Sequence, residues 1–559
     1  MAVRIESDTL IPVDLPFKVC AGPGAGKTHW LSTHIRNVLS NSKKLGITKK
    51  IVCISYTNVG ANTIMERLPV GTTSVEVCTI HSFLYKYIVK PYLHFESDYF
   101  GIDSEKIKVV PIESFLTRTF AVEVLKSIQK EWINPVIFLE GLIECSWKYS
   151  NGIFEGYKPK HPKKNKDKYG KLTRYPIPNA AYDGFVRYRW KDGFLCYDDV
   201  IYLAIELLKR QPAILKILAA KFPFFFIDEF QDSTPAIVDF VKKLASVGIV
   251  IGVVGDKAQT IYDFIGASVE IFDSFKVKQM EEYEIYGNRR CSPEIVALLN
   301  IIRPDFPQVS IGTPHGNKPF VLIGDKSAAY AKALQIVNDD VVHTLSYKNI
   351  TANTMKYKSD CSCDNTHLIN SDFDSNQERS TCIRNLIKAT EYAINNDFRE
   401  AWHHLDLIDV DRTQTIKMLR LLINHREEFF SCSLYDYYKF VRDNIFNDLP
   451  RLRAGNIKDF YLNHTYLEMV LGMSVPDSDA VHKTVHKAKG EEYDNVMLVL
   501  SEPKDLDFII HPNLKKNSFH RVYYVAFSRA RKNLFLCIPE ISVSNRKKLM
   551  KFPIEVIDV

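Results

Sequence analysis

The chain has 559 residues, of which 46% are hydrophobic and 25% are charged, and its formal net charge is +7. This length predicts several domains, and no apolar run approaches the roughly 18 residues that a membrane helix needs. The first residues lack the apolar segment of a secretory signal, and the eleven scattered cysteines are typical of reduced thiols, so we expect a cytoplasmic location.

The first informative segment, at 22–28, reads GPGAGKT and lies between an apolar run and a helical pattern. We expect a strand over 16–20 and a helix over 27–39, so that backbone N–H groups and a helix N-terminus converge on phosphate. Lys27 then reaches the β- and γ-phosphates of a nucleoside triphosphate, and the Thr28 hydroxyl ligates Mg²⁺. The residues expected at the nucleotide are Gly22, Pro23, Gly24, Ala25, Gly26, Lys27 and Thr28.

A basic run lies between Lys158 and Arg174, where eight of seventeen residues are Lys or Arg and aromatic residues are interleaved. This composition predicts a phosphate-facing loop or a disordered basic arm. The alternative is an ordinary solvated surface.

The apolar run at 222–227 leads directly into the sequence DEFQD at 228–232. A strand that ends in two carboxylates can place one toward a metal ion and the other toward an attacking water. We therefore assign Asp228 to Mg²⁺ and Glu229 to the general base. A solvated strand end is the alternative for an isolated Asp-Glu pair, but the preceding glycine-rich loop favours the functional interpretation.

Short apolar strands followed by helical patterns recur at both ends of the chain, as in parallel α/β sheets. Between them, the segment 356–380 has almost no apolar periodicity and is predicted to be a linker or mobile loop. Its Cys361, Cys363 and His367 lack the second ligand pair of a usual zinc site, so we do not predict metal there.

Six further segments complete an ordered set of motifs. They are SYTN at 55–58, TIHSF at 79–83, GDKAQTIYDFIGA at 255–267, NRRCSPEIV at 288–296, TVHKAKGEEY at 484–493 and YVAFSRAR at 524–531. With GPGAGKT and DEFQDS, they resemble a superfamily 1 helicase of the Rep, PcrA and UvrD kind. The resemblance implies an α/β fold of two RecA-like P-loop NTPase domains with parallel sheets, each carrying a mainly helical insertion.

The implied domain boundaries follow from the places of these motifs. We expect core 1A at 1–88 and 190–284, insertion 1B at 89–189, core 2A at 285–355 and 476–559, and a reduced insertion 2B at 356–475.

The resemblance also implies roles at the nucleotide for residues from both cores. Gln259 matches the glutamine that senses the γ-phosphate, and Glu492 matches an acid that contacts the nucleotide from the second core. Arg290 and Arg529 match two arginines that stabilise charge during phosphoryl transfer. ATP and Mg²⁺ are therefore the expected cofactors.

Single-stranded DNA binding needs aromatic faces for bases and donors for phosphates. Tyr56, Tyr262 and Phe264 match positions where the family stacks bases. The polar contacts expected nearby are Thr57, Asn58, Thr79, His81 and His486. Core packing is the alternative for each aromatic, and a structural histidine is the alternative for His81 and His486.

Several positions depart from the family pattern. No glutamine precedes the P-loop to read adenine, since the first glutamine is Gln129, and Arg289 stands where relatives stack a tyrosine on the base. Phe264 and Ile265 replace a Trp-Arg pair, which weakens one stack and removes one cation. The second insertion is short and lacks glycine-rich duplex-contact motifs, and we expect no fused nuclease domain.

The motifs predict an ATP-dependent DNA translocase or helicase, and the resemblance implies 3′ to 5′ movement on single-stranded or tailed duplex DNA. The alternative is a DNA-activated ATPase that serves as sensor or regulatory subunit in a nuclease-containing antiphage complex. Such a chain resembles the helicase-like subunit of Gabija-type systems, which accompanies a separate OLD-family nuclease. A P-loop kinase or transport ATPase is disfavoured because it gives Arg290 and Arg529 no role.

Overall fold

The computed structural model describes residues 2–56, 58–69, 72–166, 171–263, 266–359, 368–370, 373–408, 412–473 and 480–559. This chain divides into two compact units. The first comprises Met1–Leu93, Leu203–Lys358 and Val481–Val559, and the second comprises His94–Tyr202 and Ser359–Ala480. Two inserted segments therefore interrupt the first unit. The finer boundaries given above for cores and insertions stay a prediction.

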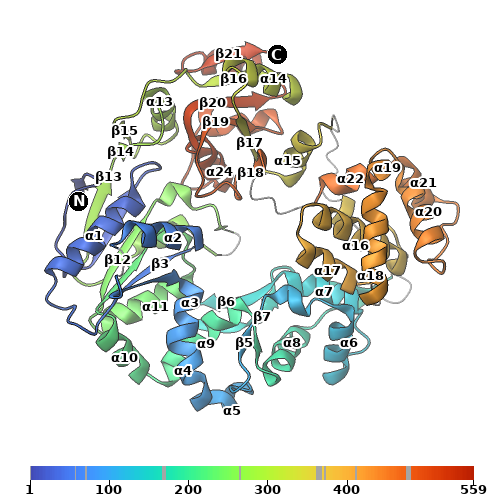
Figure 1. The fold of residues 1–559 in the computed structure, drawn as a ribbon, viewed down its shortest axis with the longest axis horizontal. Helices are drawn as coiled ribbons and strands as arrows, with labels where there is room; N and C mark the ends of the chain where they lie inside the picture. Colours follow the sequence, from blue (N-terminus) through green and yellow to red (C-terminus); the bar gives the residue numbers. More distant parts are fainter. Residues whose placement is uncertain are drawn as a thin grey trace. The chain divides into compact units, whose positions relative to one another are not determined.

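Seven parallel strands form the first sheet, in the order β1-β13-β2-β12-β11-β3-β4. They are β1 (Val3–Ile5), β2 (Phe17–Ala21), β3 (Ile51–Ser55), β4 (Val75–Thr79), β11 (Phe224–Ile227), β12 (Val250–Gly255) and β13 (Glu281–Ile285). In Figure 1, blue N-terminal strands and green strands from later in the chain accordingly belong to one sheet.

Alternating side chains of β11 anchor helices on both faces of this sheet. Phe226 packs against His34 of α1, whereas Phe225 packs against Phe83 of α3 and Phe240 of α11. The period of two along a strand explains this division. The helices in this part of the chain, all but α12 labelled in Figure 1, are α1 (Lys27–Asn41), α2 (Asn58–Arg67), α3 (Ile80–Leu84), α4 (Lys90–Tyr92), α9 (Tyr197–Arg210), α10 (Ala213–Lys221), α11 (Pro235–Ser246) and α12 (Val269–Ser274).

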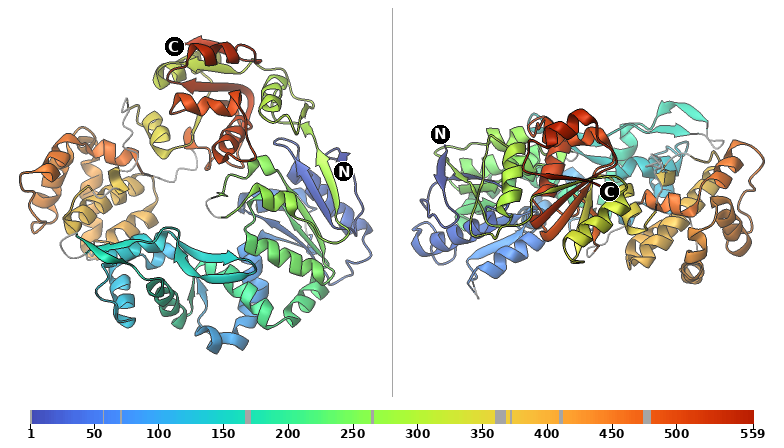
Figure 2. Two further views of the ribbon diagram at one scale, coloured as in Figure 1. Left: turned by 180° about the vertical axis from the view of Figure 1, so that it is seen from behind. Right: turned by 90° about the horizontal axis from the view of Figure 1, so that it is seen from above.

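Six parallel strands form the second sheet, in the order β18-β17-β19-β20-β16-β21. They are β16 (Phe320–Ile323), β17 (Val342–Ser346), β18 (His482–Thr484), β19 (Tyr493–Val499), β20 (Ala530–Ile538) and β21 (Glu555–Asp558). Figure 2 shows the chain's N-terminus at the first sheet and its C-terminus at the second. The predicted parallel α/β fold is thus confirmed.

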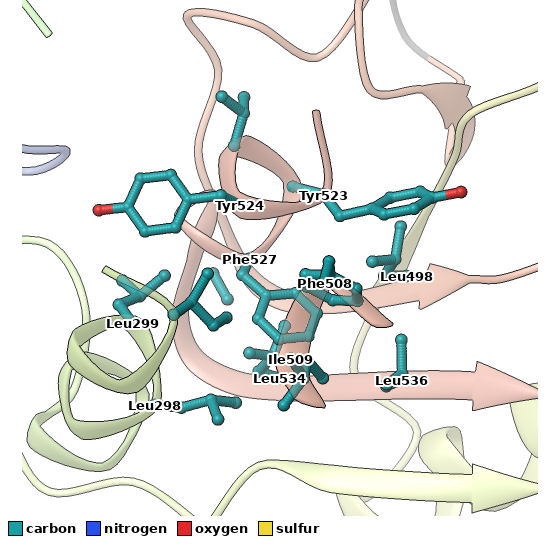
Figure 3. Close-up of a cluster of buried hydrophobic side chains, with 14 of the residues drawn as sticks. Leu298, Leu299, Leu498, Phe508, Ile509, Tyr523, Tyr524, Phe527, Leu534 and Leu536 are labelled. Atoms are coloured by element: carbon teal, nitrogen blue, oxygen red, sulfur yellow. The ribbon is translucent and has the colours of Figure 1, made fainter. Parts of the chain in front are cut away.

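Helices that precede or follow these strands build the core of the second sheet. They are α13 (Pro293–Ile302), α14 (Lys326–Ile336), α15 (Asn349–Lys356), α23 (Asp507–Ile510), α24 (Ser518–Phe527) and α25 (Val543–Leu549). Figure 3 shows Leu298 and Leu299 of α13 on the side of the cluster that faces Phe527 of α24 and Leu534 of β20. Ala258 and Ile261, which follow β12 of the first sheet, join the same buried cluster.

The second unit is mainly helical and also contains two β-hairpins. Its helices are α5 (Ser97–Phe100), α6 (Arg118–Ser127), α7 (Pro135–Ile143), α8 (Asn179–Lys191), α16 (Gln377–Ile394), α17 (Phe398–Asp406), α18 (Arg412–Asn424), α19 (Arg426–Phe430), α20 (Leu434–Asn444), α21 (Asn456–Asn463) and α22 (Tyr466–Leu471). The hairpins pair β6 (Cys145–Ser150) with β7 (Ile153–Pro159), and β8 (Lys164–Lys166) with β9 (Leu172–Pro176).

The basic run between Lys158 and Arg174 contains parts of three strands, so the prediction of a loop or disordered arm is wrong for those parts, whereas residues 160–163 form a connection between strands. Contact of the run with phosphate stays a prediction. Asn165 explains part of the order, because its buried amide donates to the Trp132 carbonyl and accepts from the Asn134 N–H. The alternative metal ligands Cys361, Cys363 and His367 lie outside the described residues. No described helix is long and apolar enough to cross a membrane.

Candidate active site

The glycine-rich loop joins β2 to α1, as the sequence predicted. Gly24 and Gly26 have φ angles of 68° and 78°, in the left-handed region that favours glycine. A Cβ atom at Gly24 would lie 2.5 Å from Asn288 Oδ1 and 2.8 Å from Arg290 Cβ. Glycine is thus required here both by the backbone and by the close approach of residues that follow β13.

Two carboxylates follow β11 and lie beside the start of α1. The Thr28 hydroxyl donates a hydrogen bond of 3.0 Å to Asp228 Oδ2, and Lys27 is also buried. Glu229 has a φ of 53°, an uncommon conformation for a residue with a side chain. Such local strain is a frequent property of functional sites.

Burial raises the pKa of Asp228, and the adjacent Glu229 charge acts in the same direction. Burial opposes ionisation of Glu229 as well, but the positive charges of Lys27 and Lys489 outweigh it and lower the Glu229 pKa. The Thr28 hydroxyl and the Asp228 carboxylate are hard oxygen donors of the kind that Mg²⁺ prefers. These residues therefore fit the ion, and their assignment as ligands stays a prediction.

A hydrogen-bonded path connects Glu229 to residues from the second sheet. The Gln231 amide donates to Glu229 and accepts from the Asp256 N–H at 3.0 Å. Gln259 Nε2 donates to Asp256 Oδ2 at 2.7 Å, and Gln259 Oε1 accepts from Arg529 Nη2 at 3.2 Å. The structure thus brings Gln259 and Arg529 together, and their action on a phosphate stays a prediction.

The two predicted arginines differ in their surroundings. Burial lowers the pKa of Arg529 to about 9, and the neighbouring Arg290 charge acts in the same direction. Arg290 instead donates to Glu492 and to the Ser528 carbonyl, the latter at 3.1 Å. Glu492 also pairs with Arg531. Glu492 therefore holds arginines in this structure, and its contact with a nucleotide stays a prediction.

Sequence reasoning missed two polar residues that contact the glycine-rich loop. Gln308 is buried and donates from Nε2 to the Pro23 carbonyl at 2.9 Å. Asn288 Oδ1 accepts from the N–H groups of Arg290 and Cys291, at 3.0 and 2.9 Å. Asn288 stands inside the NRRCSPEIV motif, which was a signal for it, whereas Gln308 belongs to no motif.

Arg289 is fixed to the same loop by its backbone. Its N–H donates to the Gly24 carbonyl at 2.9 Å, and its Nη2 lies 3.9 Å from Glu6 Oε2. Arg289 is thus beside the glycine-rich loop, with an acidic partner from the N-terminal segment.

Lys489 is a further residue that sequence reasoning missed, although it lies within the TVHKAKGEEY motif. Its Nζ donates to both carboxylate oxygens of Asp232, at 2.8 and 2.6 Å, and to the Gln259 carbonyl at 3.1 Å. It also lies 4.5 Å from the ring centre of Tyr262. Lys489 therefore connects the DEFQD segment with Tyr262, which is a predicted contact for single-stranded DNA.

The residues predicted to contact single-stranded DNA are only partly brought together. Tyr56 and Thr79 lie at the carboxyl ends of the neighbouring strands β3 and β4. The half-buried Tyr56 forms a hydroxyl hydrogen bond with Ser233, and Thr79 caps α3. Thr57, Phe264 and the side chain of Asn58 lie outside the described part of the chain.

The two candidate histidines and Tyr262 are also half-buried. Burial lowers the pKa of His81 and of His486, so both imidazoles are neutral at neutral pH. Burial raises the pKa of Tyr262 to about 12, and its ring centre lies 6.3 Å from that of His486. As contacts for DNA, these histidines would donate hydrogen bonds and would not supply positive charge.

The two parallel sheets, the glycine-rich loop and the carboxylates after β11 define a P-loop NTPase of the RecA-like class. Family models identify its branch. The UvrD/REP helicase N-terminal domain matches residues 6–279, and the UvrD-like helicase C-terminal domain matches residues 261–540. The chain belongs to the UvrD-like helicase family, as the motif resemblance predicted.

Individual relatives cover the chain to different extents. Gabija protein GajB from Bacillus cereus (strain HuB5-5) is 23% identical over 92% of this chain and 91% of its own length. The ATP-dependent DNA helicase PcrA from Staphylococcus aureus (strain Mu50 / ATCC 700699) is 26% identical over 50% of this chain, which matches 36% of PcrA. PcrA from Staphylococcus epidermidis is 26% identical over 53% of this chain and 39% of its length.

Proposed function

We propose that this chain hydrolyses ATP and uses the energy to move along single-stranded DNA, as a UvrD-like DNA translocase or helicase. The observation that carries this proposal is the path from Glu229 through Gln231, Asp256 and Gln259 to Arg529. It joins the proposed hydrolytic carboxylate beside the first sheet to a cation beside the second. A change at the phosphate can therefore alter the contact between the sheets. The family resemblance implies 3′ to 5′ movement.

Residues of the first sheet would bind the nucleotide. The N–H groups of the glycine-rich loop and the N-terminus of α1 favour anionic phosphates, and Lys27 adds a positive charge. Thr28 and Asp228 would hold Mg²⁺, which neutralises phosphate charge when bound. Glu229, whose pKa is lowered, is ionised and able to accept the proton of an attacking water.

Residues of the second sheet would complete the reaction. Negative charge spreads over the transferred phosphoryl group, so nearby cations stabilise the transition state. Arg529 already contacts Gln259, while Arg290 is beside the glycine-rich loop at Gly24. Glu492 would hold Arg290 in place.

The test is ATP turnover with and without single-stranded DNA. Glu229→Gln should lower turnover by at least about a hundredfold while nucleotide binding persists, because Lys27, Thr28 and Asp228 are intact. Lys27→Ala should weaken binding and turnover together, and Glu66→Gln, an exposed glutamate on α2, is the control. Equal rates for wild type and Glu229→Gln would remove Glu229 from the reaction, and no stimulation by DNA would contradict the motor.

A second candidate is a DNA-activated ATPase that regulates a separate OLD-family nuclease in an antiphage complex. It is favoured by the extent of the match to Gabija protein GajB, which covers 91% of that relative, against 36% for PcrA.

A tailed-duplex assay separates the two candidates. The motor should unwind a duplex with a 3′ single-stranded tail in proportion to ATP hydrolysis. Strong stimulation of ATPase by DNA without unwinding, together with co-elution of an OLD-family nuclease encoded beside this gene, would favour the regulatory subunit.

A further inference from the structure

Arg303 belongs to none of the motifs, yet it lies beside the path that links the two sheets. Its Nη1 is 2.8 Å from Asp256 Oδ1, and the two side chains are 1% and 0% exposed. Asp256 directly follows β12 of the first sheet, whereas Arg303 is the C-terminal cap of α13. The pair therefore joins the segment after β12 of the first sheet to a helix that packs against the second sheet.

Two of the partners of Asp256, Gln231 and Gln259, are parts of the proposed site. Asp256 Oδ1 accepts from the Ala258 N–H at 3.1 Å, its Oδ2 accepts from Gln259 Nε2, and its own N–H donates to Gln231. Because a carboxylate only accepts and a guanidinium only donates, Asp256 and Arg529 together set which way the Gln259 amide points. Nε2 must face Asp256, and Oε1 must face Arg529.

Arg303 also lies near both helices that adjoin the predicted arginines in the sequence, since it ends α13 and approaches Tyr524 of α24. Its helix, α13, begins three residues after Arg290, and α24 ends two residues before Arg529. The guanidinium carbon is 5.9 Å from the ring centre of Tyr524 on α24. In Figure 3, the Tyr524 ring projects from one side of α24 and the Tyr523 ring from the other.

Stability alone is a weak reason for such a pair, since replacing buried ion pairs by apolar side chains is often neutral or stabilising. The Arg189–Asp199 pair in the second unit provides a comparison, with a distance of 2.7 Å and 0% exposure of both side chains. Asp199 accepts there from Trp147, Trp190 and the Cys196 N–H, which are contacts of the local fold. Of these two pairs, only Arg303–Asp256 reaches the proposed site.

We propose that Arg303 is a positioning residue for ATP hydrolysis, which holds Asp256 and thereby orients the Gln259 amide toward Arg529. The proposal rests on the proposed function, because it assigns a role within ATP hydrolysis. It predicts that loss of the Arg303 charge lowers kcat and leaves the binding of nucleotide nearly unchanged.

The experiment compares Arg303→Met, Arg303→Lys and Arg189→Met in the full chain, with single-stranded DNA saturating. We expect Arg303→Met to lower kcat at least tenfold with KM changed less than threefold, and Arg303→Lys to restore kcat to within threefold of wild type. Arg189→Met should change kcat less than twofold, even where its midpoint of thermal unfolding falls as far as that of Arg303→Met.

If Arg303→Met does not fold, Arg303→Gln takes its place, because its polar amide is better tolerated beside the buried carboxylate while the positive charge that holds Asp256 is still lost, and the same tenfold loss is expected. A folded neutral variant with kcat within twofold of wild type would overturn the proposal. So would an equal loss of kcat in Arg189→Met, since that loss would be general destabilisation. Glu229→Gln, measured in parallel, separates the two failures: if it is inactive while the Arg303 variants are unaffected, only the role of Arg303 is wrong.

Discussion

The nucleotide site and the residues predicted to contact single-stranded DNA both include residues that follow strands of the first sheet, but they are built differently. Asp228, Gln259 and Arg529 are each 3% exposed, and hydrogen bonds connect the last two. Tyr56 and Tyr262 are half-buried, and each already has a partner of its own, Ser233 and Lys489. The phosphate chemistry is thus organised by the fold, whereas DNA must compete with existing contacts. Substitutions in the two regions should separate turnover from strand affinity.

The largest effect is expected at Arg529. Arg529→Ala removes a cation that contacts Gln259, and such arginines contribute about 10³ to 10⁵ in rate. We therefore expect kcat to fall by about 10³ with little change in KM, because the contact is strongest in the transition state. Arg546→Ala, an arginine paired with Asp558 at the second sheet, is the control. A change confined to KM would show that Arg529 binds only the ground state.

A smaller effect is expected in the glycine-rich loop. Gly24→Ala places a side chain at a φ of 68° and against Asn288 Oδ1. The left-handed conformation alone costs about 1–2 kcal/mol for a residue with a Cβ atom, so nucleotide affinity should fall about tenfold or more. Titration with a fluorescent ATP analogue measures this, and Gly46→Ala, with nothing within 4 Å of its Cβ, is the control. Unchanged affinity would mean that the loop does not cradle phosphate.

The sequence predicted this loop well because its signals are local. A strand over 16–20 and a helix over 27–39 correspond to Phe17–Ala21 and Lys27–Asn41. Glycine spacing and the following helical pattern need no distant partner. The family motifs likewise placed Gln259 and Arg529 in one site, although they are 270 residues apart.

Other features depend on contacts that no local pattern encodes. Gln308 reaches Pro23 across 285 residues, and nothing around Gln308 in the sequence indicates that contact. Arg303 was missed for the same reason, since its partner Asp256 belongs to the other sheet. In the basic run, the dense charge gave no signal of the strands. These strands form because they pair with neighbouring strands and because Asn165 is buried and hydrogen-bonded.

An effect of similar size to that at Gly24 is expected at Tyr56, where the ring and the hydroxyl can be tested separately. Tyr56→Ala should weaken single-strand affinity by about 1–3 kcal/mol if the ring stacks on a base. Tyr56→Phe keeps the ring and removes only the hydrogen bond to Ser233, so it should bind DNA nearly as wild type does. Fluorescence anisotropy with a labelled oligonucleotide measures both. Equal affinity of Tyr56→Ala and wild type would show that this ring only packs in the core.

The smallest effect concerns the basic run of the second unit, where Lys160 and Lys164 are exposed. If these side chains contact phosphates, DNA binding by the variant with both lysines replaced by Gln releases fewer counterions from the DNA. The slope of log affinity against log salt concentration should then flatten by about 0.7 per lost contact on single-stranded DNA. ATP turnover without DNA should not change, because the hydrolysis site belongs to the first unit. A matched pair, Lys547→Gln and Lys551→Gln, removes two exposed charges beside the second sheet. An equal slope in both double variants would mean that the run is a solvated surface, and that strand affinity comes from the first unit alone.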